Sequence, residues 1–195
     1  MSILKTLRNH WKLTLTGLVA LFVFSVGVGI SGAYVLAATS TEEFCVGCHE
    51  MSYNFEEYKG TIHDKNRTGV RAICTDCHVP HTPGPLVLAK IKASKDMFYT
   101  YIIPSINTKE KFEAKRAEMA HVVWKEMMAS DSHQCRSCHR ADKMDVDAQS
   151  AVAQKKHAKA KAEGTTCIEC HYGIAHTEPS GPAPSELFGK KVASN

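Results

Sequence analysis

Four copies of one short pattern, C-x-x-C-H, constrain this chain more than any other feature of its sequence. In c-type cytochromes, two thiols with this spacing bond a haem covalently and the adjacent histidine binds its iron. The four copies use all eight cysteines of the chain. The thiols are Cys45, Cys48, Cys74, Cys77, Cys135, Cys138, Cys167 and Cys170, and the adjacent histidines are His49, His78, His139 and His171. The pattern predicts four covalently bound c-type haems.

Two other readings of the cysteines compete with haem. Paired C-x-x-C units also build zinc sites, and eight cysteines in a small exported protein are enough for four disulfides. A zinc site does not require a histidine directly after each second cysteine, and disulfide frameworks rarely use C-x-x-C spacing alone. The repeated histidine therefore favours haem over both alternatives.

The second strong feature is an uncharged segment near the N-terminus. Residues 13–36 run for about 24 residues without a charge, which is enough to cross a hydrocarbon core of about 30 Å. Three basic residues precede this segment, and two glutamates are the first charges after it. By the positive-inside rule, residues 1–12 are cytoplasmic, residues 13–37 form a transmembrane anchor, and the remainder is exported. A cleaved signal peptide is the alternative, but its apolar core is typically only about 7–15 residues long.

This topology suits haem attachment, which takes place outside the cytoplasm. It predicts a single-pass protein of a bacterial inner membrane with its haem domain in the periplasm. Within the anchor, Ser25, Gly29 and Ala33 form a ridge of small residues of the kind that lets membrane helices pack closely. A homodimer formed through this ridge is one hypothesis.

The exported part is expected to be one domain, residues 38–178, followed by a Pro- and Ser-rich tail, residues 179–195, that we expect to be disordered. Helical periodicity predicts helices over residues 85–101, 107–129 and 145–163, and no segment has strand periodicity. Motifs one and two are close in sequence, as are motifs three and four, which suggests two dihaem modules. The predicted fold is mainly α with much irregular loop: one N-terminal transmembrane helix and a multihaem c-type cytochrome domain.

Seven histidines lie outside the motifs and compete for the remaining iron positions. A haem used only for electron transfer normally has both axial positions filled. His10 falls on the cytoplasmic side of the anchor and cannot reach a haem. The six others are His63, His81, His121, His133, His157 and His176.

Several stretches beyond the motifs resemble a known family. They are residues 41–51 (TEEFCVGCHEM), 66–72 (NRTGVRA), 77–81 (CHVPH), 90–95 (KIKASK) and 173–176 (GIAH). They resemble the NapC/NirT/NrfH family of membrane-anchored tetrahaem quinol dehydrogenases, and most of all its NapC branch, over nearly the whole exported domain. The resemblance implies oxidation of membrane menaquinol or ubiquinol and electron transfer to a periplasmic reductase complex, with nitrate reductase favoured.

Carried over residue by residue, the resemblance implies that His63, His81, His157 and His176 are the distal iron ligands. His176 follows His171 too closely to bind the same iron from the opposite face, and in the family it serves the second haem. His63 and His157 are then expected at the third and fourth haems, in an order that the sequence leaves open. His81 has the weakest support, and His121 and His133 match no position where the family requires histidine.

The first motif continues to Met51, giving C-x-x-C-H-x-M. In the NrfH branch the methionine at this position replaces the motif histidine as iron ligand. The resemblance thus implies Met51 at the first haem, which would leave the far face of that haem to a nearby quinol. The alternative is that His49 binds the iron and Met51 only packs against it.

Lys90 and Asp96 match family positions that contact quinol. A carboxylate beside the haem edge would accept a proton from quinol, and a lysine would orient a quinol oxygen. Two plainer readings stay open: an i,i+4 ion pair between Lys92 and Asp96, and attraction of the lysines to anionic lipid.

Two other functions remain as alternatives. A catalytic multihaem reductase needs an open haem pocket, and the C-x-x-C-K motif of pentahaem nitrite reductases is absent from the sequence. A tethered electron relay without a quinol site would need neither Lys90 nor Asp96. The net charge of +4 comes with no nucleic-acid recognition motif, so no nucleic-acid partner is expected.

Overall fold

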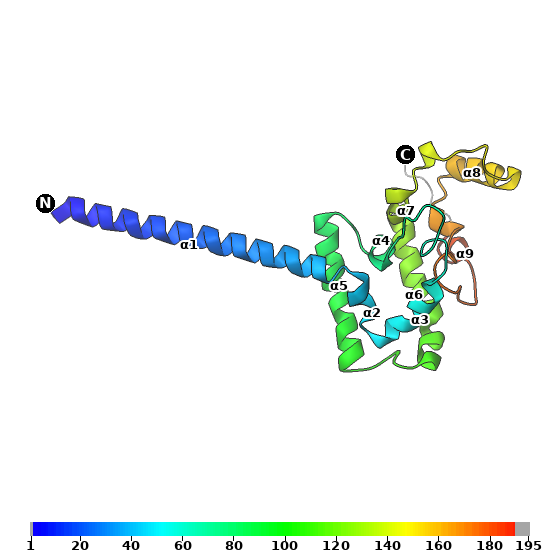
Figure 1. Ribbon diagram of the computed structural model, residues 1–195, viewed down its shortest axis with the longest axis horizontal. Coiled ribbons are helices and arrows are strands. Elements are labelled where there is room, and N and C mark those ends of the chain that lie inside the picture. Colours follow the sequence, from blue (N-terminus) through cyan, green and yellow to red (C-terminus); the bar gives the residue numbers. More distant parts are fainter. Residues whose placement is uncertain (1, 190–195) are drawn as a thin grey trace. The chain divides into compact units, whose positions relative to one another are not determined.

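The computed structural model describes residues 2–189, with side chains from Trp11 onward, and divides the chain into two units, residues 1–40 and 41–195. The first unit is one continuous helix, α1 (Ser2–Ala38), drawn in blue in Figure 1. Its part from Trp11 to Ala38 has a mean hydropathy of 2.2 and is long and apolar enough to cross a membrane. The helix thus begins earlier than the expected anchor at residue 13, because nothing in the preceding basic segment breaks a helix.

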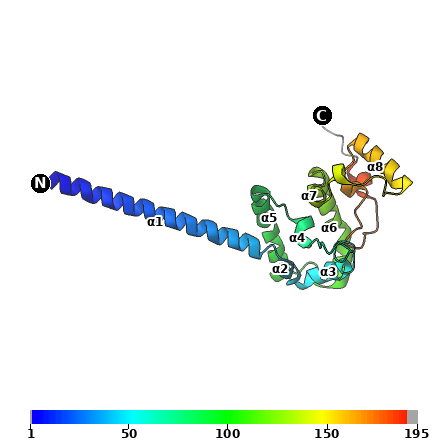
Figure 2. The same ribbon diagram turned by 45° about the horizontal axis from the view of Figure 1, so that its top comes forward.

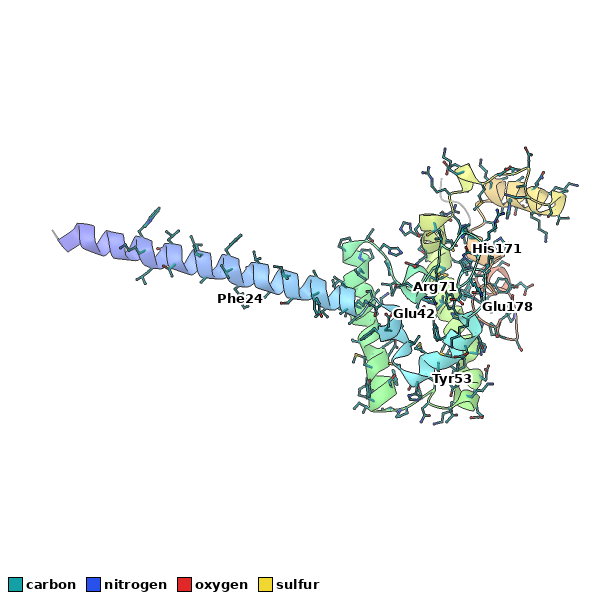
Figure 3. The ribbon with its side chains drawn as sticks, viewed as in Figure 1. Phe24, Glu42, Tyr53, Arg71, His171 and Glu178 are labelled. Carbon is teal, nitrogen blue, oxygen red and sulfur yellow. The ribbon has the colours of Figure 1, made fainter. Side chains whose placement is uncertain are left out.

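The side chains of the membrane segment suit a lipid environment. Phe24 and its apolar neighbours point outward along the helix (Figure 3). The hydroxyl of Ser25 donates to the carbonyl of Leu21 over 2.8 Å, so this polar group is satisfied within the helix itself. In a hydrocarbon core, such internal pairing avoids the cost of an unsatisfied polar group.

The second unit is built from helices joined by irregular segments, and its described part, up to residue 189, contains no strand. Two long helices, α5 (Pro83–Tyr101) and α6 (Lys109–Ala129), stand on either side of the short α4 (Cys74–His78), as Figures 1 and 2 show. The remaining helices are α2 (Glu42–Val46), η1 (His49–Met51), α3 (Ser52–Tyr58), α7 (His133–Cys138), η2 (Ala141–Lys143), α8 (Ala151–Glu163), η3 (Cys167–Glu169) and α9 (Pro184–Phe188). The predicted fold class is confirmed.

Helix α6 carries most of the buried apolar side chains. Trp124, Met127 and Met128 pack with Ile168 of η3, and Tyr172 meets the Trp124 ring at 5.3 Å. Further along α6, Phe112 is 1% exposed and its ring lies 5.1 Å from that of Tyr53 on α3. The buried apolar side chains of this unit are thus concentrated along α6.

The ends of the helices follow local chemistry. The side chain of Thr108 accepts from the Lys111 N–H and caps α6. Helix α8 ends at Gly164, whose φ of 65° is the left-handed conformation that glycine adopts easily. The start of α8 differs from the prediction: Asp145 accepts from two following backbone N–H groups in a turn, and Ser150 then caps a helix that begins at Ala151 rather than at residue 145.

The tail also differs from the expected disorder over residues 179–189. Helix α9 starts with Pro184, a residue suited to a first helical turn, and that proline is buried. The ring of Phe188 lies 6.3 Å from that of His121 on α6. Apolar residues thus fold this Pro- and Ser-rich segment onto α6; residues 190–195 lie outside the described part.

Phe112→Ala should lower the free energy of unfolding by about 3–5 kcal/mol, because it removes a fully buried aromatic side chain. Val122→Ala is the matched control: Val122 is on the same helix and 54% exposed, so its loss should change stability by no more than about 0.5 kcal/mol. Guanidinium unfolding of the detergent-solubilised protein measures both. Equal losses in the two variants would mean that the α3–α6 contact does not organise this core.

Candidate haem-binding site

The four C-x-x-C-H motifs lie beside one another in chain order. The side chain of Cys45 in motif one interacts with Cys74 of motif two, and that of Cys135 in motif three with Cys167 of motif four. Helix α4, which is motif two, packs against both α2 and α7, and α7 contains both cysteines of motif three. No disulfide joins any of the eight cysteines. The motifs therefore form one continuous row, in which adjacent attachment points are close together.

Each motif coincides with a short helical segment, or begins or ends within one. Motif two fills α4, motif three ends α7, motif four begins η3, and Cys45 lies in α2. Two cysteines three residues apart lie on one side of a helical turn. In motifs two and three, where both cysteines lie in one helix, local helical structure thus directs the two thiols toward the same side.

Three motif histidines face a second histidine from outside the motifs. The ring centroids of His78 and His176 are 6.1 Å apart, those of His139 and His63 are 6.0 Å apart, and those of His171 and His157 are 6.1 Å apart. The sequence alone left the order of His63 and His157 open. In the structure, His63 faces motif three and His157 faces motif four.

These separations fit one metal ion between each two rings. An iron about 2 Å from one nitrogen of each imidazole would hold the centroids about 6 Å apart. Burial lowers the pKa of His63 and of His176, which favours the neutral ring that binds metals. The buried Nδ1 of His63 also has no hydrogen-bond partner within the described residues. The residues present therefore fit haem iron with two histidine ligands.

The segment that carries His63 is fixed by its backbone and its neighbours. The Tyr58 hydroxyl donates to the carbonyls of His63 (3.0 Å) and Ala72. Arg71 donates to Asp64 at 2.7 Å and to Glu42 of α2 at 3.0 Å (Figure 3 labels Arg71 and Glu42). Two ion pairs and a shared hydroxyl thus hold the loop beside α2, which contains the first cysteine.

His176 is held through its neighbour Thr177. The Thr177 N–H donates to Glu57 over 2.9 Å, and Arg116 donates to both oxygens of the same carboxylate over 2.9 and 2.5 Å. Arg116 also donates to Glu113 of α6. Burial raises the pKa of Glu57, but the hydrogen bonds from Arg116 and Thr177 outweigh it, and the pKa of Glu57 stays below its ordinary value. This cluster joins α3, α6 and the C-terminal segment around a ligand candidate.

Motifs three and four are joined by a buried hydroxyl pair. Ser132 has a positive φ of 50°, and its hydroxyl lies 2.5 Å from that of Thr166. The Ser132 oxygen also accepts from the Ile168 N–H at 3.1 Å. The strained backbone before motif three thereby contacts the start of motif four directly.

The first motif is surrounded differently. The side chain of His49 is 62% exposed and lies 3.4 Å from the buried carboxylate of Glu50. Within residues 11–189, no second histidine ring faces His49 as one faces each of the other motif histidines. Met51 ends the same short helix, η1, and is partly exposed.

Lys90 and Asp96 both lie on α5. Lys90 is close enough to Cys45 to help lower the pKa of that thiol, after the larger effect of the hydrogen bond with Cys74. Burial raises the pKa of Asp96, while Lys95 lowers it by less. Much of α5 is apolar and exposed, including Leu88 and Ile91. The two candidate quinol residues are thus on a helix that approaches motif one.

The remaining histidines of the second unit face no motif histidine within the described part of the chain. His81 is exposed between α4 and α5, so the structure does not place it with the other three ligand candidates. His121 packs against Trp124 and Phe188. His133 is exposed at the start of α7. The side chain of His10 lies outside the described residues.

Several residues that position these histidines were not found from the sequence. These residues are Tyr58, Glu57, Arg116 and Gln149, and the side chain of Gln149 contacts the His157 ring. Most of them contact residues that belong to other elements of the fold. Arg116 and Glu57 are separated by 59 residues, and Glu57 and Thr177 by 120. No local sequence pattern identifies pairs that are so far apart in the chain. The contact between Gln149 and His157 could have been predicted from the local sequence, because only eight residues separate them.

A row of C-x-x-C-H motifs with facing imidazole pairs defines a multihaem c-type cytochrome. Comparison with known proteins identifies its family. Residues 7–181 match the family described as "NapC/NirT cytochrome c family, N-terminal region". The chain belongs to this family of cytochromes c, which implies covalently bound c-type haem. Family membership and α1 together indicate a single-pass inner-membrane protein that carries electrons.

Three relatives illustrate the similarity. The chain is 45% identical to the cytochrome c-type protein NapC of Escherichia coli K12, over 91% of both chains. It is 48% identical to the denitrification system component NirT of Stutzerimonas stutzeri, over 86% of this chain and 81% of that protein. It is 46% identical to the cytochrome c-type protein TorY of E. coli O157:H7, over 89% of this chain but only 47% of that protein. No solved structure matches the chain.

Glu57→Gln should destabilise the domain by about 1.5–3 kcal/mol, the usual range for hydrogen bonds to a charged group. Glu113→Gln is the matched control, because it shares Arg116 but does not contact Thr177; it should cost about 1 kcal/mol or less. The pKa of Glu57 is lowered in the folded state. The difference in free energy of unfolding between wild type and Glu57→Gln should therefore be largest at neutral pH and should disappear as pH falls through that pKa. If this difference increased in acid instead, the ionised Glu57 carboxylate would not be the stabilising group.

Proposed function

We propose that the protein oxidises a membrane quinol, menaquinol or ubiquinol, and passes the electrons to a periplasmic reductase. The N-terminus would be cytoplasmic and the exported unit periplasmic, with four haems attached to the four motifs. The observation that carries this proposal is the row of motifs with three facing imidazole pairs. Such pairs suit electron transfer, because filled axial positions exclude other ligands from the iron.

The facing rings support a definite ligand assignment. We assign His78 and His176 to the second haem, His139 and His63 to the third, and His171 and His157 to the fourth. His81, expected as a weaker candidate, is left without a haem in this assignment. When bound, the haems supply one-electron carriers, and the protein supplies their ligands, burial and spacing.

The first haem differs and is the proposed entry point. Only residues 39–44 separate the end of α1 from Cys45, and each residue extends the chain by no more than about 3.5 Å. Motif one therefore stays near the membrane surface. Met51, two residues beyond His49, is the proposed iron ligand there, with His49 as the alternative.

Quinol oxidation releases two electrons and two protons. Asp96, whose pKa is raised by burial, would accept a proton from a quinol hydroxyl. Lys90, close to Cys45, would orient the second quinol oxygen. The exposed apolar side chains of α5 offer a surface that an apolar quinol tail can contact.

A nitrate reductase complex is the favoured acceptor, because the chain and the NapC relative cover each other almost completely. The similarity to NirT and TorY supports a different periplasmic reductase as the alternative. A tethered relay without a quinol site is the second alternative, and the quinol experiment below separates it from the main proposal.

Replacing a distal ligand should change one haem at a time. His63→Ala, His157→Ala and His176→Ala should each convert one low-spin haem to high-spin in optical and EPR spectra, whereas the control variants His121→Ala and His133→Ala should not.

The ring planes of His63 and His139 are 86° apart, against 31° and 41° for the other two pairs. The oxidised protein should accordingly show one low-spin signal typical of perpendicular imidazoles. Four bis-histidine signals would refute Met51 ligation.

Asp96→Asn should slow haem reduction by a soluble quinol analogue about 100-fold or more, the lower end of the range for losing a positioned proton acceptor, and Lys90→Ala should also slow it. Lys92→Ala on the same helix is the control, and dithionite should reduce all variants equally. Because Asp96 must be ionised to accept a proton, the wild-type rate should rise with pH through its raised pKa. Unchanged rates in both variants would favour the relay without a quinol site.

A further inference from the structure

The ring of His157 has a hydrogen-bond partner of its own, in the side chain of Gln149. His157 Nδ1 lies 2.7 Å from Gln149 Oε1. The other two distal histidines are held differently: the Tyr58 hydroxyl contacts the His63 backbone, and Glu57 contacts the residue after His176. At His157 a side chain contacts the imidazole itself, whereas the contact to the His176 ring comes from the backbone of Asn54.

Gln149 is fixed by its own backbone on both sides. Its N–H donates to the Val146 carbonyl at 3.1 Å, and its carbonyl accepts from Gln154 Nε2 at 3.0 Å. It is partly buried, whereas its neighbours from residue 139 to residue 152 are exposed. The glutamine therefore extends from an anchored position and is not a freely moving surface side chain.

The ring of His157 has little else to orient it. Helix α8 contains no buried residue and lies at the edge of its unit, beyond α7 (Figures 1 and 2). Helical side chains lean toward the N-terminus of their helix, which directs His157 back toward Gln149. Across from it, the His171 ring (labelled in Figure 3) is 6.1 Å away at 41°.

The hydrogen bond also selects a tautomer. A neutral imidazole has one N–H donor and one nitrogen with a free lone pair. If Nδ1 carries the hydrogen and donates it to Gln149 Oε1, then Nε2 keeps the lone pair that a metal requires. The opposite arrangement, with the glutamine amide donating to Nδ1, would leave Nε2 protonated and unable to bind iron.

We propose that Gln149 is a positioning residue for the fourth haem: it fixes the orientation and tautomer of His157 and tunes the reduction potential of the haem attached at Cys167 and Cys170. This inference rests on the proposed ligation of that haem by His157 and His171. An acceptor on Nδ1–H raises the basicity of the ligating nitrogen. A more basic ligand favours ferric over ferrous iron, so a stronger acceptor at position 149 lowers the potential.

The test uses the full-length, haem-loaded protein in detergent, with Gln149→Leu and Gln149→Glu. Leucine removes the acceptor and should raise the potential of one haem, favouring its reduced form about tenfold, or about 59 mV for one electron. Glutamate keeps the length and adds charge, and should lower the same potential. Spectroelectrochemical titration resolves the four potentials, and the low-spin EPR signal of the same haem should shift in g-value.

Gln154→Leu is the matched control. It removes the amide that anchors the Gln149 backbone but leaves the contact with the ring, so any potential shift should be smaller than that of Gln149→Leu. Shifts of the same sign in the leucine and glutamate variants, or no shift in either, would overturn the proposal. A haem count of four in each variant by pyridine haemochrome assay separates these outcomes from failed maturation.

A double variant separates failure of this inference from failure of the ligand assignment. If His157 binds iron, His157→Ala removes one low-spin signal, and adding Gln149→Leu to it should produce no further shift. If His157→Ala leaves all low-spin signals intact, the ligand assignment itself is wrong. If it removes one signal while Gln149→Leu and Gln149→Glu have no effect on their own, only the role of Gln149 is wrong.

Discussion

Three pairs of imidazole rings face each other at separations that suit one metal ion between them. Two of these pairs join segments that are far apart in the sequence, because His63 faces His139 and His78 faces His176. The buried apolar side chains lie mainly on α6. Charged and hydroxyl contacts around Arg116, Arg71 and Ser132 join further segments to one another.

Much of this architecture could be predicted because its signals are local. The C-x-x-C-H spacing, the uncharged N-terminal segment and the glycine that ends α8 each need only a few neighbouring residues to interpret. The predictions differed from the structure where specific contacts mattered more than local composition. Side-chain hydrogen bonds of Asp145 and Ser150 form a turn and a cap, so that α8 begins later than predicted. In the Pro- and Ser-rich tail, Pro184 is buried and Phe188 packs against α6.

The sequence identified the candidate histidines of the site but not which motif each of them faces. Only the tertiary structure places His63 opposite motif three and His157 opposite motif four. The same holds for Glu57, whose two main partners are distant in sequence. Gln149 differs, because its contact with His157 spans only eight residues and depends on how helical side chains lean.

The order of the pairs along the chain has a consequence for biogenesis. A chain is synthesised from its N-terminus, so His63 exists before His139, and His157 before His171. His176 comes long after His78, and its neighbour Thr177 joins Glu57 from the beginning of the domain. The second imidazole pair therefore cannot form before residue 176 has been made. Its closure adds a direct link between the first and last parts of the domain, which α6 already joins through the Tyr53–Phe112 and Trp124–Ile168 contacts.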